Sequence, residues 1–214
     1  MMLLEEIFKS KKAENSDHFN LRVHRSISWL KKSLELSHDL DLQFISLWVS
    51  FNAIYARDAN ITQDKQAFRD FLNKICQVDE QHRIYNVIWE KYSQPIRLLL
   101  ESPYISNAFW DYQNQKISKN AWLEDQQSEQ RKVHRALEHK DTVDILFVIF
   151  NRLYTLRNQL MHGGATYNSS VNRKQLKDGC NVLSALLPGF IQIVLENANA
   201  LDLGQPFYPV VQVS

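Results

Sequence analysis

DTVDILFVIFNRLYTLRNQLMHGG, residues Asp141 to Gly164, is the stretch that decides the fold. Asp141 and Thr142 are both suited to begin a helix, because their side chains accept hydrogen bonds from free N–H groups of the first turn. The pair Gly163 and Gly164 predicts its end, since glycine readily adopts the left-handed conformation found there. Between them, apolar side chains recur at helical spacing and form a wide stripe: Ile145, Leu146, Ile149, Phe150, Leu153, Tyr154, Leu156 and Leu160.

The rest of the chain repeats this helical pattern. Helices are expected over about 16–36 and 42–57, after Thr62, from about Asp79, at Pro95 and Pro103, and over about 172–199, where Pro188 should kink or break the helix. The helix over 42–57 is apolar nearly all round, which is typical of the centre of a bundle. On the helix over 16–36, one inward face is expected to contain Val23, Ile27, Leu30 and Leu34.

With only 5 Gly and 5 Pro in 214 residues and no βαβ pattern, the chain is expected to form an all-α, single-domain helical bundle over 1–214. Residues 113–140 are its most polar part. They are interpreted as an exposed helix or as a partly mobile excursion. Residues 205–214 contain two prolines and are interpreted as an extended tail.

Composition limits the function. The formal net charge is +1, so any contact with nucleic acid must be local. Cys76 and Cys180 match no disulfide framework or zinc pattern, and both are expected to be reduced and buried. No metal motif or nucleotide-binding glycine loop is present, so no metal and no cofactor are expected. The N-terminus does not resemble a signal peptide and apolar runs reach six residues, so we expect a cytoplasmic protein without a membrane span.

The end of the 141–164 segment carries residues suited to phosphodiester chemistry. Arg157 is a permanent cation that matches phosphate oxygens, and His162 transfers protons near neutral pH. Five residues of ideal helix turn through about 500°, so these two side chains lie roughly 140° apart. Asn158 and His162, four residues apart, share a face. Both cationic residues are also favoured at a helix C-terminus by the helix dipole alone, which is a purely structural alternative.

The segment Arg152 to Leu183, RLYTLRNQLMHGGATYNSSVNRKQLKDGCNVL, closely resembles the ApeA-like HEPN branch of the HEPN superfamily. FISLWVSFNAIYA, from Phe44 to Ala56, resembles the central helix of the same branch. The RNase signature of that superfamily, R-x(4–6)-H with a polar residue after the arginine, falls on Arg157, Asn158 and His162.

This resemblance implies a metal-independent endoribonuclease of the toxin or antiphage type, working as a homodimer with the motif at its interface. Arg173 and Asn172 are further candidates for RNA contact. Some members carry a tyrosine that a nucleotidyltransferase modifies two residues after the histidine. Here Gly164 occupies that position, which argues against this modification, while a nucleotidyltransferase or another regulatory protein stays a candidate partner. Two alternatives remain: a non-catalytic HEPN module that binds RNA, nucleotide or a protein partner, and a purely structural helical dimer.

Overall fold

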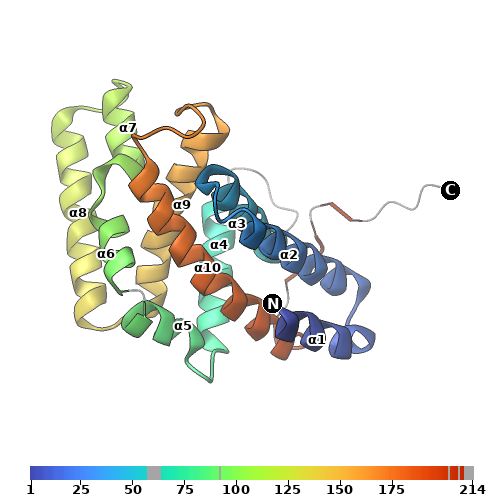
Figure 1. The fold of residues 1–214 in the computed structure, drawn as a ribbon. Helices are drawn as coiled ribbons and strands as arrows, with labels where there is room; N and C mark the ends of the chain where they lie inside the picture. The colour runs from blue at the N-terminus through green and yellow to red at the C-terminus, as the bar shows by residue number, and fades with distance from the viewer. Residues whose placement is uncertain (57–63, 92, 202, 207, 210–214) are drawn as a thin grey trace. The chain divides into compact units, whose positions relative to one another are not determined.

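The computed structural model describes residues 1–56, 64–91, 93–201, 203–206 and 208–209, and within these ranges the chain is helical with no β-strand (Figure 1). The expected all-α fold is therefore confirmed. The chain divides into two compact units. Unit 1 comprises residues 1–84 and 183–214, and unit 2 comprises residues 85–182. Each unit is compact in itself, and a single domain over 1–214 stays a prediction.

Unit 1 is built from α1 (Met2–Lys11), a 3-10 turn η1 (Lys12–Glu14), α2 (Asp17–Glu35), α3 (Leu40–Tyr55), α4 (Asp64–Gln77) and the second part of α10 (Arg173–Glu196). Ser16 caps α2 by accepting a hydrogen bond from the N–H of Phe19, and Asp39 caps α3 by accepting one from the N–H of Leu42. The helices predicted from these stretches are confirmed. The expected start after Thr62 lies outside the described residues.

The core of unit 1 is rich in aromatic rings. Phe51 lies at its centre, with ring contacts to Tyr55, Phe71 and Phe190. α2 and α3 approach closely where two buried serines meet, with Ser50 Oγ donating to the carbonyl of Ser26 at 2.8 Å. Small side chains permit this approach, and each buried hydroxyl has a partner.

One expected core residue of α2 is wrong. Leu34 is 49% exposed, because it lies in the last turn of α2, where Ser33 turns inward instead. The other three members of the expected face, Val23, Ile27 and Leu30, are buried as predicted.

A buried arginine joins three parts of unit 1. Arg22 is 1% exposed, and its Nη1 donates to the carbonyl of Ile54 at 3.0 Å near the end of α3. Its Nη2 donates to the carbonyls of Leu203 and Gly204 at 3.1 and 3.2 Å. These carbonyls have no partner within a helix, so the guanidinium satisfies them and fixes the segment that follows α10. Most of the tail expected to be extended, residues 205–214, lies outside the described residues.

Unit 2 contains η3 (Val87–Lys91), a π-helical segment that continues α5 (Arg83–Asn86), followed by α6 (Ser93–Glu101), the 3-10 turn η4 (Pro103–Ile105), α7 (Asn107–Gln113), α8 (Lys119–Glu138), α9 (Thr142–Met161) and the first part of α10. The polar stretch 113–140 is largely the exposed helix α8, which Ser118 caps. The loop alternative for this stretch is wrong for residues 119–138, since α8 is continuous.

Three helices of unit 2 end in the same way. In each, a residue with positive φ follows the C-cap and two N–H groups bond back into the last turn, as in the Schellman motif. For α9, Gly163 has φ +70°, its N–H donates to the Leu160 carbonyl, and the N–H of Gly164 donates to the Gln159 carbonyl at 2.7 Å. At the corresponding position, α7 has Gln115 (φ +59°) and α8 has Lys140 (φ +51°). The predicted glycine stop of α9 is confirmed.

The sequence predicts a kink or a break of α10 at Pro188, and the break does not occur. The helix runs from Arg173 to Glu196, and buried apolar side chains flank the proline on both sides. Before the helix begins, Ser169 Oγ accepts a hydrogen bond from the N–H of Val171.

Among the described helices, α10 alone is long and apolar enough to cross a membrane, with a mean hydropathy of 1.4 over its most apolar window. That window is 61% buried, as in the core helix of a soluble protein, so the evidence for a span is weak. The cytoplasmic location stays a prediction.

Candidate functional site

α9 carries the motif from the core of unit 2 to its surface. Asp141 caps the helix by accepting a hydrogen bond from the N–H of Asp144 at 3.0 Å, which decides between the two predicted starts. From Arg157 onward the side chains are half-buried or exposed. The last turn therefore presents the motif while the preceding turns anchor it through buried side chains, namely Ile145, Leu146, Ile149, Phe150, Leu153 and Leu156.

Two of the three motif residues are joined directly. Arg157 Nη1 donates to Asn158 Oδ1 at 2.8 Å, and the guanidinium carbon lies 5.9 Å from the centre of the Tyr154 ring. The half-buried arginine is thus held from two sides. Its guanidinium has further N–H groups besides the one that bonds to Asn158, and these can donate to an anion. A guanidinium restrained in this way loses less conformational entropy when it binds an anion.

His162 stands apart from this pair. It is the C-cap residue of α9, with φ −101° and ψ 15°, and its side chain is exposed. Over the described ranges, no hydrogen bond or ion pair joins its imidazole to Arg157 or Asn158. For Arg157 this agrees with an ideal helix, which separates it from His162 by roughly 140°, whereas Asn158 lies only about 40° from His162 and bonds to Arg157 instead.

The two further candidates occupy different environments. Arg173 begins α10, and its Nε donates to the carbonyl of Ser169 at 2.8 Å, so the guanidinium is tied to the loop that follows α9. Asn172 is only 6% exposed, which places its amide inside unit 2 and away from a phosphate at the surface. Neither of its side-chain polar atoms has a hydrogen-bond partner among the described residues. The RNA contact expected of Asn172 is therefore not part of the proposed site.

An aromatic cluster that the sequence reasoning missed lies against the motif helix. Gln159 Nε2 and Trp110 Nε1 both donate to the backbone carbonyl of Tyr104, each at 2.7 Å. Phe109 packs between Tyr104 and Trp110, edge to face with both. The signal was present in the sequence, since four of the nine residues from 104 to 112 (YISNAFWDY) are aromatic.

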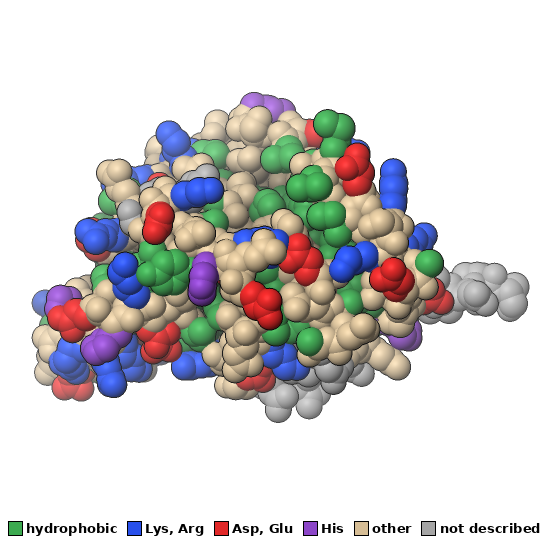
Figure 2. All heavy atoms as spheres, turned by 90° about the horizontal axis from the view of Figure 1, so that it is seen from below, with side chains coloured by type: hydrophobic (Ala, Val, Ile, Leu, Met, Phe, Trp, Pro, Cys, Tyr) green, Lys and Arg blue, Asp and Glu red, His purple; other side chains and the backbone are tan. Residues whose placement is uncertain are grey.

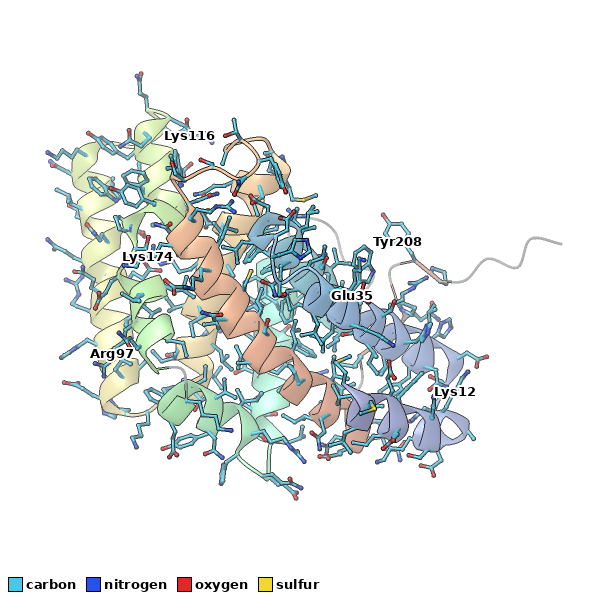
Figure 3. The ribbon with its side chains drawn as sticks, in the orientation of Figure 1. Lys12, Glu35, Arg97, Lys116, Lys174 and Tyr208 are labelled. Atoms are coloured by element: carbon cyan, nitrogen blue, oxygen red, sulfur yellow. The ribbon has the colours of Figure 1, made fainter. Side chains whose placement is uncertain are left out.

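Basic residues outnumber acidic ones in the segment that contains and follows the motif and in the segment that contacts its helix. We call residues 102–122 together with residues 157–178 the motif end of unit 2. It contains two aspartates, Asp111 and Asp178, and six basic residues: Lys116, Lys119, Arg157, Arg173, Lys174 and Lys177. Its formal charge is +4, and since the whole chain carries +1, the remainder carries −3. Figure 3 marks Lys116 at the turn after α7 and Lys174 in the first turn of α10.

Because the whole chain is only weakly charged, it can attract an anion only through a local excess of positive charge such as this one. On the face drawn in Figure 2, by contrast, acidic and basic side chains are interspersed and neither sign dominates.

A buried ion pair lies elsewhere in unit 2. Arg152, 6% exposed, donates from Nη2 to Glu129 and from Nη1 to the carbonyl of Ser102 at 3.1 Å. Burial raises the pKa of the Glu129 carboxyl, and the attraction of Arg152 offsets this only in part. The pair borders a cavity of about 480 Å³ between α6, α8 and α9. Sequence reasoning missed it because Arg152 and Glu129 occupy different helices, 23 residues apart.

No metal centre is formed by the residues that the structure describes, since no three His, Cys, Asp or Glu side chains come together there. Cys180 is buried and Cys76 is half-buried, and neither forms a disulfide. Cys76 is thus more exposed than predicted.

Comparison with protein-family models, curated proteins and solved structures finds no match to this chain.

Proposed function

We propose that the chain is a metal-independent endoribonuclease of the HEPN type, with Arg157, Asn158 and His162 as its catalytic residues. One observation carries the proposal. The last turn of a deeply anchored helix presents a restrained guanidinium and an exposed imidazole within one helical turn and a half, in a part of unit 2 with a formal charge of +4. Anion binding and proton transfer are the two tasks that RNA cleavage requires.

The chemistry needs no group outside the protein. A base removes the proton of the ribose 2′-hydroxyl, and the 2′-oxygen attacks the adjacent phosphorus. The bond from phosphorus to the 5′-oxygen breaks, and an acid protonates that oxygen. The products are a 2′,3′-cyclic phosphate and a 5′-hydroxyl. His162 transfers the protons, Arg157 stabilises charge on the phosphorus oxygens, and Asn158 orients Arg157.

The reaction needs both a base and an acid, whereas one chain offers a single motif histidine. We therefore propose a two-fold homodimer in which two copies of the motif face one another. Apolar side chains around the motif favour this arrangement. Met161, Tyr167 and Val171 are 54%, 71% and 85% exposed and lie close together in sequence, and a contiguous group of exposed apolar side chains is typical of an interface.

A non-catalytic HEPN module that binds RNA, nucleotide or a protein partner is the second candidate. The observation that favours it is that the imidazole of His162 hydrogen-bonds none of the described side chains, so a single chain holds no prepared base. A purely structural helical dimer is weaker, because it gives no role to the basic motif end.

The test is cleavage of mixed RNA by the purified chain in EDTA, with His162→Ala and Arg157→Ala beside the wild type. General acid–base catalysis contributes about 10²- to 10⁴-fold, so the cleavage rate of His162→Ala should be at least about 10²-fold lower than that of the wild type. The chain supplies a matched control in His139, which occupies the same C-cap position on α8 before a residue of positive φ. His139→Ala should cleave like the wild type.

The outcomes separate the candidates. Products with cyclic phosphate ends, lost in both motif variants and kept in His139→Ala, support the nuclease. RNA binding without cleavage by the wild type supports the binding module. If His139→Ala loses activity as strongly as His162→Ala, the C-cap histidine acts structurally and the proposed catalytic role is wrong.

The dimer is tested separately. Specific activity should fall when the chain is diluted below the dissociation constant measured by sedimentation. Activity proportional to the monomer concentration would contradict a composite site.

A further inference from the structure

We propose that Tyr104 and Trp110 form a platform on which unpaired bases of a bound RNA stack, on the face of α9 that carries His162. This inference rests on the proposed function and adds two binding residues that lie outside the motif. Both side chains are well exposed for aromatic residues, with 56% of Tyr104 and 38% of Trp110 accessible to solvent.

The two rings are held from behind. Phe109 contacts Tyr104 at a centroid distance of 5.5 Å and Trp110 at 5.3 Å, both at an interplanar angle of 85°. Phe109 in turn packs on Trp122 of α8 at 5.8 Å. Rings fixed in this way lose little side-chain entropy when a base stacks on them, which favours binding.

The polar group of Trp110 is already satisfied. Its indole N–H donates to the carbonyl of Tyr104 at 2.7 Å, within the same cluster. What the residue offers to a ligand is therefore ring surface rather than a hydrogen bond. Every nucleobase has a π-face, so such a surface binds single-stranded RNA with little preference for sequence.

A single carbonyl connects this platform to the motif helix. The carbonyl of Tyr104 accepts from Gln159 Nε2 as well as from Trp110, both at 2.7 Å. Gln159 precedes His162 by three residues, which places the two side chains about 60° apart on one face of α9. The platform is thus fixed to the face of α9 that carries His162.

Charge favours RNA as the occupant over a protein partner. The platform belongs to the motif end, whose formal charge of +4 contrasts with −3 for the remainder of the chain. A strand of RNA complements both features of this surface. Its negative phosphates suit the basic residues, and its flat bases suit the exposed rings. Duplex RNA keeps its bases stacked internally, so the platform favours unpaired strands.

The test uses full-length chain carrying His162→Ala, so that bound RNA stays intact. Binding of a fluorescein-labelled oligouridine of about 12 nucleotides is measured by anisotropy, beside an abasic strand of the same length. Stacking is worth about 1–3 kcal/mol per base, so Tyr104→Ala and Trp110→Ala should each weaken oligouridine binding about 5- to 150-fold. Binding of the abasic strand should not change.

Three controls sharpen the reading. Trp110→Phe keeps a ring and should bind within about threefold of the parent. Trp29, 41% exposed on α2 of unit 1, matches Trp110 in exposure, and Trp29→Ala should leave both strands bound as before. Lys174→Ala removes a charge and should weaken both strands equally.

The outcomes distinguish this inference from the proposed function. If the wild type binds oligouridine through the two rings but cleaves no RNA, the platform stands and the nuclease is wrong. If it cleaves RNA and both alanine variants bind and cleave normally, the nuclease stands and the platform is overturned. Dissociation of the dimer by Tyr104→Ala, without weaker RNA binding per dimer, also overturns the platform and assigns the rings to the protein interface.

Discussion

Arg157 and Asn158 are neighbours in sequence whose side chains bond to one another, Nη1 to Oδ1 at 2.8 Å, while His162 stands free of both. The amide therefore acts on the arginine rather than on the histidine. This changes the role expected from helix geometry, in which Asn158 and His162 share a face.

Replacing Asn158 tests this role. Asn158→Ala removes the acceptor and should lower the rate of RNA cleavage about fivefold, the equivalent of one hydrogen bond of about 1 kcal/mol. Because Asn158 is half-buried, the melting temperature should stay nearly constant. Asn120→Ala, at an exposed position of α8, is the control and should cleave normally. Unchanged cleavage by Asn158→Ala would contradict an orienting role.

The shared helix endings of unit 2 predict a pair of opposite stability changes. Gly163→Ala places a Cβ on a residue with φ +70° and should lower the free energy of unfolding by about 1 kcal/mol. Gln115→Gly removes a Cβ at φ +59° in the equivalent position of α7 and should raise it by a similar or smaller amount. Urea denaturation measures both. The same sign in both variants would contradict the argument.

The carboxyl of Glu129 should make stability depend on pH in a definite direction. Its pKa is raised above the ordinary value of 4.5, mainly by burial, so the folded chain binds this proton more tightly than the unfolded chain does. The stabilisation is fully present below 4.5 and is lost as the pH rises through that value toward the raised pKa.

Glu129→Gln isolates this effect, because glutamine does not titrate. The free energy of unfolding of the wild type relative to the variant should decline in urea titrations as the pH rises from below 4.5 through the raised pKa of Glu129. A difference that grows with pH would mean that Arg152 outweighs burial and lowers the pKa instead.

Arg22 should be among the least replaceable residues of unit 1. Arg22→Met keeps the apolar stem but leaves the carbonyls of Ile54, Leu203 and Gly204 without their donor, and the expected loss is about 3 kcal/mol in urea denaturation. Arg25 is the matched control, one turn along α2. It also donates to a carbonyl, that of Tyr208, but at an exposed position. Arg25→Met should cost under about 1 kcal/mol, and equal losses would contradict the burial argument.

Local signals in the sequence predicted most helices well, because each is encoded by its own periodicity and caps. The ends of α9 at Asp141 and Gly163 are the clearest examples. The predicted burial of Leu34 is wrong, because periodicity shows which side of a helix a residue occupies but not how far the neighbouring helix extends. The predicted break at Pro188 does not occur, because the loss of one backbone hydrogen bond is outweighed by the buried side chains around it.

The candidate site was predictable only in part. Arg157, Asn158 and His162 lie within six residues, so one helix end brings them to the same surface. The proximity of Tyr104 to Gln159, 55 residues apart, depends on how η4 packs against α9, which no local pattern encodes. The burial of Asn172 was not predictable from the sequence, because a polar residue at a helix start is usually exposed.

The ending of α9 also sets the register of its last turn. A Cβ at Gly164 would lie 3.1 Å from the Gln159 carbonyl oxygen, so the chain reverses at a fixed residue. Inserting one alanine between Asn158 and Gly163 would leave the composition of the motif intact but rotate the imidazole by about 100° relative to the guanidinium. The number of residues between the arginine and the glycine pair, as much as their identity, therefore sets the relative directions of the guanidinium and the imidazole.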